Sequence, residues 1–397
     1  MSEPGDIHSP DCCEPNESGF IMPGGKVDPE AVRRAYQDAR EQGDDEFLVR
    51  VQFEIARASL STRLDKYLTT RVTFMSRNQL QSLMADGGAT VNSKPAKPST
   101  KLKAGDRIEL VIPPPPSGEI EPDEIPLTVL FEDEHLLVLN KQPDIIVHPA
   151  RSENRGTMVN ALAWHFANVS GGELSTVGKD FARPGVVHRL DRNTSGCIVF
   201  AKSDQAHWKL GSQFQDRKVN KRYLALTQGW VEPDHQVIDF PLGPHQSKAR
   251  GMREKRVVRH DELGKPSVTV CSVLERYELP RCKPSDPTQR YSLVELDLKT
   301  GRTHQIRVHL SHIGFPIVGD DMYGGRPFFD SSSQPVLDRQ ALHAAYLSFE
   351  HPITNQPLEF IAPLRDEFLY IINDLRSRAS VQTIDHPDTL EMSRIGL

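Results

Sequence analysis

The sequence GVVHRLDRNTSGCIVFAKS, residues 185–203, decides how the rest of the chain is interpreted. Two apolar runs, both containing β-branched residues, enclose the polar segment HRLDRNTS at 188–195, and this pattern predicts a strand, a loop and a second strand. Flanking strands fix the backbone, so the loop presents its side chains in defined positions. Arg189 and Asp191 are two residues apart and share a face of an extended chain. We therefore expect both to point into the same space.

An ordinary turn is the alternative interpretation of the same loop. Asp and Asn side chains in turns often bond only their own backbone, and Thr194, Ser195 and Gly196 are common turn-closing residues. The local pattern leaves both interpretations open.

The composition is that of a soluble globular protein. The chain has 397 residues, enough for two or three domains, with 37% hydrophobic and 26% charged residues. No apolar run approaches the roughly 20 residues that span a bilayer, so no membrane contact is expected. The start, MSEPGDIHSP, lacks the basic and apolar parts of a secretory signal. The five cysteines form no CxxC pair, so we expect a reducing, cytoplasmic location.

Charge is unevenly distributed along the chain. Residues 1–60 hold 13 acidic and 6 basic side chains, whereas 61–112 hold 9 basic and 4 acidic ones. We interpret 1–60 as a largely flexible, acidic leader with one short helix at 29–42. The proline-rich run at 113–126 predicts a stiff linker. A large domain at 127–376 and a frayed tail at 377–397 complete the predicted organisation.

The basic unit at 61–112 shows the pattern of two helices followed by a hairpin, and it resembles an S4 domain, a small α/β RNA-binding module. Basic side chains that meet phosphates supply affinity for RNA without reading its sequence. The expected RNA-binding residues are Arg63, Lys66, Arg71, Arg77, Lys94, Lys97 and Lys101.

A second polar cluster, KTGRTHQIRVHLSHIGFPIVGDDMYGG, occupies 299–325. Thr303 is expected to cap a helix that ends at Gly314. His304, His309 and His312 suggest a metal site, but they do not share one helical face and no carboxylate has helical spacing to them, so no metal is expected. A phosphate-binding P-loop, a kinase signature and a dinucleotide fingerprint are all absent from the sequence, which argues against phosphoryl transfer and nicotinamide or flavin cofactors.

Three motifs in order, HRLDRNTSG, KRYLAL and GRTHQIRVHL, resemble the RluA family of pseudouridine synthases, over about residues 61–376. The resemblance implies an α+β catalytic domain with a mixed, largely antiparallel sheet. It also implies isomerisation of uridine to pseudouridine in RNA, without cofactor or metal. An S4 domain in front is usual in the branch of this family that modifies large-subunit ribosomal RNA. The implied partner is therefore a 23S-type RNA, and a monomer is the default expectation.

The resemblance also assigns roles to residues. Asp191 corresponds to the catalytic aspartate, Arg307 to its basic partner, and Tyr223 to the aromatic residue that lies against the target base. Arg189 corresponds to the side chain that fills the space left by the extruded uridine. The expected catalytic residues are Asp191, Tyr223 and Arg307, and the expected substrate-binding residues are Arg189, His188, Ile306 and Thr194.

Departures from the family pattern leave these groups intact. Gln142 and Asp144 stand where the family commonly has Pro and Gly, and Asn193 replaces a common Asp. The alternative hypothesis is a catalytically silent RNA-binding or ribosome-assembly factor with the same fold. A third hypothesis, an RNA-directed hydrolase that uses Asp191 and His188, needs a metal or a second carboxylate that the sequence does not offer.

Overall fold

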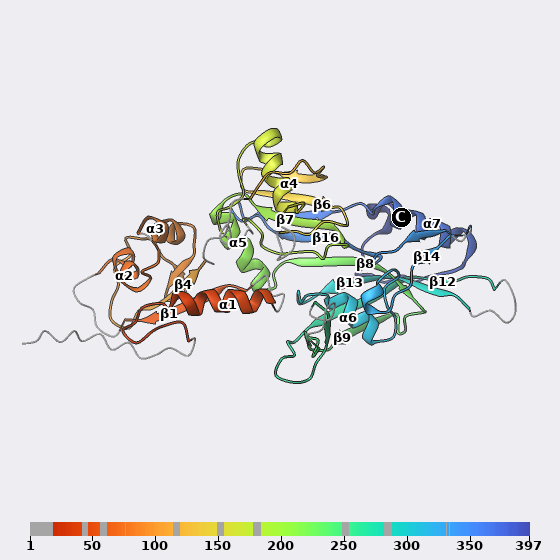
Figure 1. Ribbon diagram of the computed structural model, residues 1–397, viewed down its shortest axis with the longest axis horizontal. Coiled ribbons are helices and arrows are strands. Elements are labelled where there is room, and N and C mark those ends of the chain that lie inside the picture. Colours follow the sequence, from red (N-terminus) through yellow and green to blue (C-terminus); the bar gives the residue numbers. More distant parts are fainter. Residues whose placement is uncertain are drawn as a thin grey trace, which may run out of the picture.

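Ten strands form one large sheet in the computed structural model of this chain (Figure 1). The structure describes residues 19–41, 47–55, 62–75, 77–113, 120–148, 155–177, 184–247, 254–281, 288–330, 332 and 334–397. The strand order is β18-β12-β13-β8-β16-β7-β6-β5, with β17 paired to β16 and β9 paired to β12. Among the described strands of this sheet, β7 and β16 are parallel and all other pairs are antiparallel. This arrangement confirms the predicted mixed, largely antiparallel sheet.

The strands of the large sheet have the following bounds: β5 Val129–Glu132, β6 Leu136–Lys141, β7 Ser195–Ala201, β8 Asn220–Gln228, β9 His235–Asp239, β12 Val268–Glu278, β13 Arg290–Leu298, β16 Leu342–Glu350, β17 Pro357–Ile361 and β18 Ser380–Thr383. Two small hairpins lie outside it: β10 Leu242–Pro244 with β11 Arg256–Val258, and β14 Phe328–Phe329 with β15 Pro335–Leu337. The helices of this part are α4 Met158–His165, η1 Phe166–Ser170, α5 Asp204–Gln215, α6 Gln305–His312, η3 Asp321–Tyr323, α7 Asp366–Arg378 and η4 Met392–Ile395.

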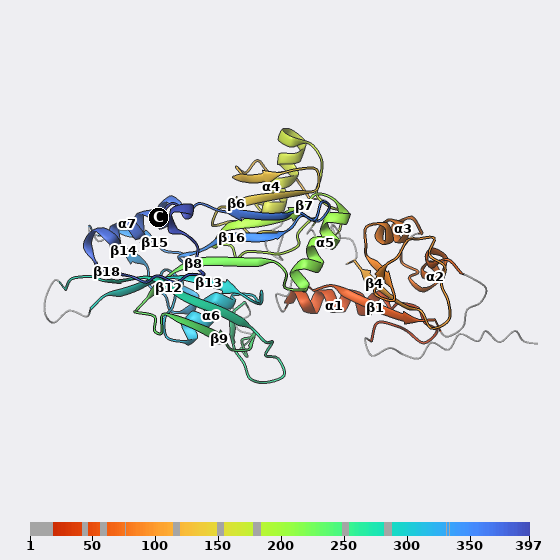
Figure 2. The ribbon, with the colours of Figure 1, turned by 180° about the vertical axis from the view of Figure 1, so that it is seen from behind.

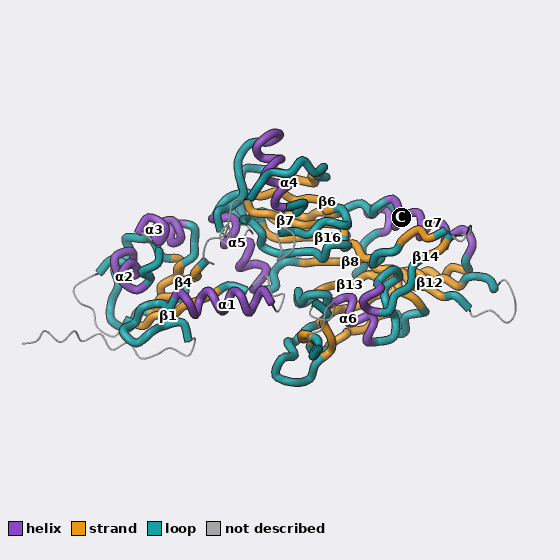
Figure 3. Tube along the Cα trace, viewed as in Figure 1, coloured by secondary structure: helices purple, strands orange, loops and turns teal. Residues whose placement is uncertain are grey.

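Helices cover both faces of the β6–β7 part of the sheet (Figure 3). Side chains alternate between the two faces along a strand, so Leu137 and Leu139 of β6 belong to one apolar core and Leu136 and Val138 to the other. The first core is covered by α4 and α7, and the second by α5. Because both faces are buried, β6 and β7 read as continuous apolar runs rather than as alternating ones.

The N-terminal unit lies beside α5, at the end of the molecule opposite to α7 (Figures 1 and 2). It contains α1 Pro29–Glu41, β1 Val49–Glu54, α2 Leu64–Arg71, α3 Arg77–Ala85, β2 Ala89–Val91, β3 Lys94–Pro95 and β4 Arg107–Ile112. Its four strands form a sheet in the order β1-β4-β2-β3, and its core includes Trp208 of α5. The predicted pair of helices and hairpin is present.

The predictions of a flexible leader and a frayed tail both need correction, because apolar side chains of these segments are buried in the two cores. The leader was expected to extend to residue 60, yet β1 pairs with β4 along six residues and Val27 and Val32 are buried in the N-terminal core. Residues 1–18 lie outside the described part. The C-terminal tail was expected to fray, yet β18 pairs with β12 and Ile395 is buried in the large core. Residues 114–119 of the predicted linker are also outside the described part. None of the described helices is long and apolar enough to cross a membrane.

Candidate active site

The loop that carries Asp191 leads directly into β7. Before the loop, Val186 forms a single bridge with Phe200, so the first of the two predicted strands is reduced to one pair of residues, whereas the second is β7. Gly185 explains the difference, because its φ of +66° turns the chain just before the bridge.

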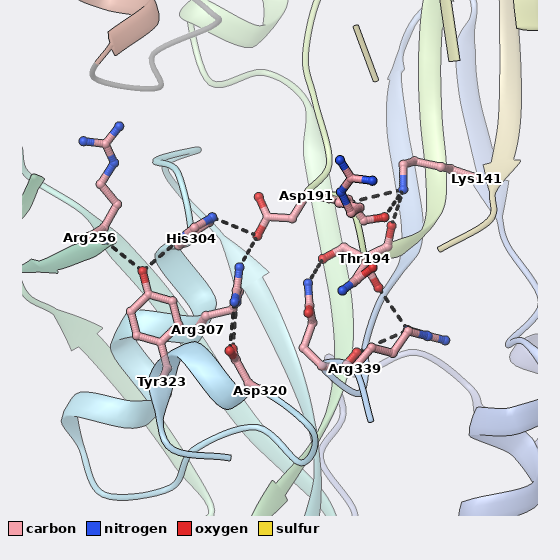
Figure 4. Close-up of polar contacts among 12 residues, drawn as sticks. Lys141, Asp191, Thr194, Arg256, His304, Arg307, Asp320, Tyr323 and Arg339 are labelled. Atoms are coloured by element: carbon pink, nitrogen blue, oxygen red, sulfur yellow. Dashed lines mark hydrogen bonds and ion pairs between the residues drawn. The ribbon is translucent and has the colours of Figure 1, made fainter. Parts of the chain in front are cut away.

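Lys141, at the end of β6, holds this loop by hydrogen bonds from its ammonium group (Figure 4). Its side chain is fully buried, and its ammonium group donates hydrogen bonds to backbone oxygens of Gln142 (2.9 Å), Arg192 (2.8 Å) and Thr194 (2.9 Å), with Asp191 at 3.3 Å. Burial lowers the pKa of Lys141 to about 7, against the opposing effect of the Asp191 charge. The lysine therefore fastens the loop to the sheet through several main-chain oxygens at once.

Arg339 and Gln340, just before β16, hold the loop from the other side. Arg339 donates to the backbone oxygen of Asn193 at 3.0 Å and is itself paired with Glu367. Gln340 donates to the Thr194 hydroxyl oxygen at 3.3 Å. Thr194 thus orders the loop, as the turn interpretation expects, and its side chain is almost fully buried.

The parallel pairing of β7 with β16 brings two distant segments into close contact. Gly196 has a φ of +114°, and a Cβ there would lie 2.2 Å from the backbone oxygen of Ala344, so only glycine fits. Next to it, the His343 ring lies 2.8 Å from the Ser195 hydroxyl through Nδ1 and 3.1 Å from the Ala362 backbone oxygen through Nε2. A carbonyl only accepts, so Nε2 carries the proton and Ser195 donates to Nδ1.

Arg307, on α6, joins Asp191 to a second carboxylate (Figure 4). Its Nη1 lies 3.2 Å from Oδ2 of Asp191, and its Nε and Nη2 donate to Asp320 at 2.7 and 2.8 Å. Asp320 is buried and holds the guanidinium by a two-bond fork, which leaves the remaining nitrogen directed at Asp191. The predicted pair of Asp191 and Arg307 is therefore in contact.

The charges around Asp191 keep it ionised. Burial alone would raise its pKa, but the nearby guanidinium groups of Arg307 and Arg189 lower the pKa of Asp191 below its ordinary value. Burial also lowers the pKa of His304 to about 4, so this histidine is neutral near pH 7 and the two arginines supply the positive charge there. The Asp191 side chain is 17% exposed, so it remains accessible from the pocket.

His304 precedes α6 in a left-handed backbone conformation with φ of 57°. Thr303 was expected to cap this helix, but the capping position is His304, whose side chain makes no capping hydrogen bond. The Gln305 side-chain oxygen accepts from the Arg302 N–H at 3.0 Å and from the Thr300 hydroxyl at 2.7 Å, which orders the turn before the helix. The helix ends at His312, and Gly314 follows with φ of +91°.

A pocket opens around Asp191 and collects most of the predicted site residues. It is lined by residues from the loop, from β8 and from the start of α6, including the expected Tyr223 and Ile306, both almost fully buried. The predicted residues in its lining are His188, Arg189, Asp191, Thr194, Tyr223, Ile306 and Arg307.

His188 lines this pocket but is held mainly by the protein itself. Its Nε2 accepts a hydrogen bond from the Val199 N–H at 3.0 Å, and its ring stacks on Phe214 at 4.5 Å. Burial lowers the pKa of His188 to about 3, so it is neutral at physiological pH. These contacts suit a residue that positions the loop.

A basic groove continues from the pocket toward the N-terminal unit. It shares Lys221 and Arg302 with the pocket and adds Arg217 and Lys299, while Phe47 of the N-terminal unit contributes to its wall. In the N-terminal unit the buried Asp65 binds Arg63 at 3.0 Å and Arg77 at 2.8 Å. Of the expected RNA-binding residues, Arg71 is half-buried and the others are exposed.

Sequence reasoning missed Lys141, Asp320, Tyr323 and Arg339. Asp320 and Tyr323 belong to the GDDMYG segment, which the sequence comparison noted without assigning roles. Within the described part of the chain, no group of three or more His, Cys, Asp or Glu side chains is arranged to hold a metal ion.

Comparisons with known proteins identify relatives of this chain. A sequence model described as RNA pseudouridylate synthase matches residues 135–312, and one for the S4 domain matches 62–108. A Bacillus subtilis protein named "Uncharacterized RNA pseudouridine synthase YlyB" is 38% identical, covering 80% of this chain and 95% of its own. A Zymomonas mobilis protein named "Ribosomal large subunit pseudouridine synthase D" is 39% identical over 79% of this chain and 93% of its own. The solved structure "Human RNA Pseudouridylate Synthase Domain Containing 1" is 27% identical, covers 71% of this chain and 98% of its own, and has a TM-score of 0.48.

Proposed function

Because the chain belongs to the family of RNA pseudouridine synthases, we propose that it isomerises specific uridines in large-subunit ribosomal RNA, with Asp191 as the reacting carboxylate. The isomerisation breaks the bond between ribose C1′ and uracil N1 and forms a bond between C1′ and C5. C5 loses its proton and N1 gains one, so the reaction consumes no second substrate, and we propose that it needs no cofactor.

The contact between Asp191 and Arg307 is the observation that carries this proposal. Whether the carboxylate attacks carbon or removes a proton, it must be ionised and close to the sugar and the base. Arg307 favours the ionised form, and Asp320 keeps Arg307 in place.

Asp191 lies within a pocket and its side chain is only 17% exposed, so the target uridine must turn out of its helix or loop to reach it. Extrusion costs a few kcal/mol, which stacking and a gap-filling side chain can offset. We assign stacking to Tyr223 and gap filling to Arg189, both in the lining of the pocket.

The choice of ribosomal RNA rests on the names of relatives and on the N-terminal unit. The Zymomonas relative and others of comparable coverage are named for the large ribosomal subunit. The exposed lysines of the S4 unit and the basic groove that leads to the pocket supply phosphate contacts along one RNA.

The test is to incubate the purified protein with a 23S-type ribosomal RNA transcript and map pseudouridine by carbodiimide adducts that stop reverse transcriptase. We expect new stops at a few defined uridines, and none in a reaction without protein. An RNA that is bound with nanomolar affinity but never modified would reject the proposal and favour the silent assembly factor.

A further inference from the structure

His304 stands at the edge of the pocket with its two ring nitrogens facing different partners. Nδ1 lies 2.8 Å from the hydroxyl of Tyr323, and Nε2 lies 3.8 Å from Oδ2 of Asp191 (Figure 4). Its side chain is 13% exposed. The residue belongs to the lining of the pocket, and nothing in the proposed function uses it yet.

The Tyr323 hydroxyl decides which nitrogen carries the proton. That oxygen accepts a hydrogen bond from the backbone N–H of Arg256 at 2.9 Å. Its remaining partner among the described residues is Nδ1 of His304, so the hydroxyl proton has one acceptor available. Burial raises the pKa of Tyr323, which keeps that proton on the oxygen. Nδ1 is then the acceptor, and the histidine proton resides on Nε2.

The backbone conformation of His304 determines where its ring points. A left-handed conformation is uncommon for non-glycine residues, although histidine adopts it more often than most, and from this conformation His304 directs Nε2 toward Asp191. The 3.8 Å separation is too long for a hydrogen bond, so the Nε2 proton is left directed into the pocket beside the carboxylate.

We propose that His304, fixed by Tyr323 as the neutral Nε2–H form, donates a hydrogen bond to a carbonyl oxygen of the target uracil. This inference rests on the proposed function and adds a substrate-binding residue to it. When the bond between C1′ and N1 breaks, its electron pair stays with the base and negative charge grows on the carbonyl oxygens. A neutral donor stabilises that charge without losing its proton, as donors in oxyanion holes do.

The tautomer can be tested without any RNA. In protein labelled with 15N-histidine at pH 7, we expect the His304 signals, identified by their loss in His304→Gln, to show the Nε2–H form. Tyr323→Phe removes the hydroxyl and should shift His304 toward the Nδ1–H form or a mixture. A wild-type His304 with its proton on Nδ1 would overturn the proposal, whatever reaction the protein catalyses.

The role in catalysis is tested by comparing three variants at His304 in single-turnover reactions. His304→Gln places an amide N–H near the position of Nε2, whereas His304→Asn suits the left-handed backbone better but its amide reaches only the position of Nδ1. The third variant, His304→Ala, has no donor at all. We expect His304→Ala and His304→Asn to react about 100-fold more slowly than the wild type, as for loss of one oxyanion-hole donor. The glutamine variant should recover a large part of that loss.

His312→Ala is the matched control, because His312 is exposed on the same helix and outside the lining of the pocket. It should react at the wild-type rate. If the asparagine variant is as active as the glutamine variant, His304 serves the backbone only and the proposal fails. If the wild type itself makes no pseudouridine, the proposed function fails, and the 15N result stands independently.

Discussion

Arg307 lies between two carboxylates with different tasks. Its fork to Asp320 is buried and rigid, whereas its single contact with Asp191 faces the pocket. A guanidinium can serve both because its donors point in fixed directions, which the single ammonium of a lysine cannot reproduce. The pair therefore fixes both the charge and the position of Asp191.

Replacement of Asp191 by asparagine tests this assignment directly. Asp191→Asn keeps the size of the side chain and the backbone oxygen near Lys141, but removes the charge. We expect pseudouridine formation to fall by several orders of magnitude, as for other reacting groups, with RNA affinity nearly unchanged. Product yield in single-turnover reactions and filter binding of the same RNA measure the two quantities. Comparable rates for variant and wild type would remove Asp191 from its role.

Residues with a charge partner inside a recognisable motif were predictable from the sequence, whereas residues that contact backbone were not. The three motifs led to Asp191, Tyr223 and Arg307, and all three line one pocket. Lys141 donates to main-chain oxygens whose positions depend on the fold, so no sequence pattern could reveal its role. His188 was expected to bind substrate; it lines the pocket, and its ring also accepts from the Val199 N–H and stacks on Phe214, so its role in binding stays a prediction.

At the scale of elements, the N-terminal unit combines a folded scaffold with exposed charge. Lys94 begins β3, and Lys97 and Lys101 follow in the loop before β4, all three exposed. Sequence analysis identified these lysines but did not predict that β1, before the S4 unit, joins the same sheet, because nothing in the local sequence links β1 to β4 over 50 residues away.

The variant Lys94→Ala/Lys97→Ala/Lys101→Ala tests the contribution of this loop to RNA binding. Each lost phosphate contact should lower the slope of log affinity against log salt by about 0.7 to 0.9. We expect weaker binding at low salt and a flatter salt dependence, with an unchanged melting temperature. An identical salt slope in the variant would show that this surface does not meet RNA.

The C-terminal segment after α7 gives a second prediction at this scale. β18 pairs with β12, Leu390 and Ile395 are buried, and the Leu390 N–H donates to Glu295 at 2.7 Å. Deletion of residues 379–397 exposes the surface that these two side chains cover, at about 2–5 kcal/mol for each large aliphatic side chain lost from a core. We expect a clearly lower urea midpoint. A midpoint equal to that of the full chain would argue that this segment contributes no packing.

At the scale of the whole molecule, five buried histidines link stability to pH; burial lowers the pKa of one of them, His309, below its ordinary value. Burial lowers the pKa of His188 to about 3, and those of His207, His304 and His343 to about 4. Between pH 6.5 and 4 the unfolded chain binds protons at these positions and the folded chain does not, so stability falls as pH falls.

Urea unfolding between pH 7 and 4.5 measures this dependence. Each histidine contributes up to about 1.4 kcal/mol per pH unit within its window. We expect His343→Gln to be less stable than the wild type at pH 7, because it loses the hydrogen bonds of the ring to Ser195 and Ala362. Its free energy of unfolding should decrease less steeply than that of the wild type as the pH is lowered. The exposed His312→Gln is the control and should follow the wild-type slope. A variant curve parallel to that of the wild type would contradict the assignment of a neutral His343.

The parallel contact between β7 and β16 can form only after both strands have been synthesised, and they lie far apart in the sequence. The Ser195 hydroxyl and the His343 ring that meet there are 148 residues apart in sequence. At synthesis rates of about 5–20 residues per second, a ribosome needs roughly 7–30 s to pass from one to the other. During that interval the loop with Asp191 has left the peptidyl-transferase centre, but β16 and the residues before it that hold the loop have not been made. The loop that carries Asp191 therefore lacks its contacts to Arg339 and Gln340 until these two residues have been translated.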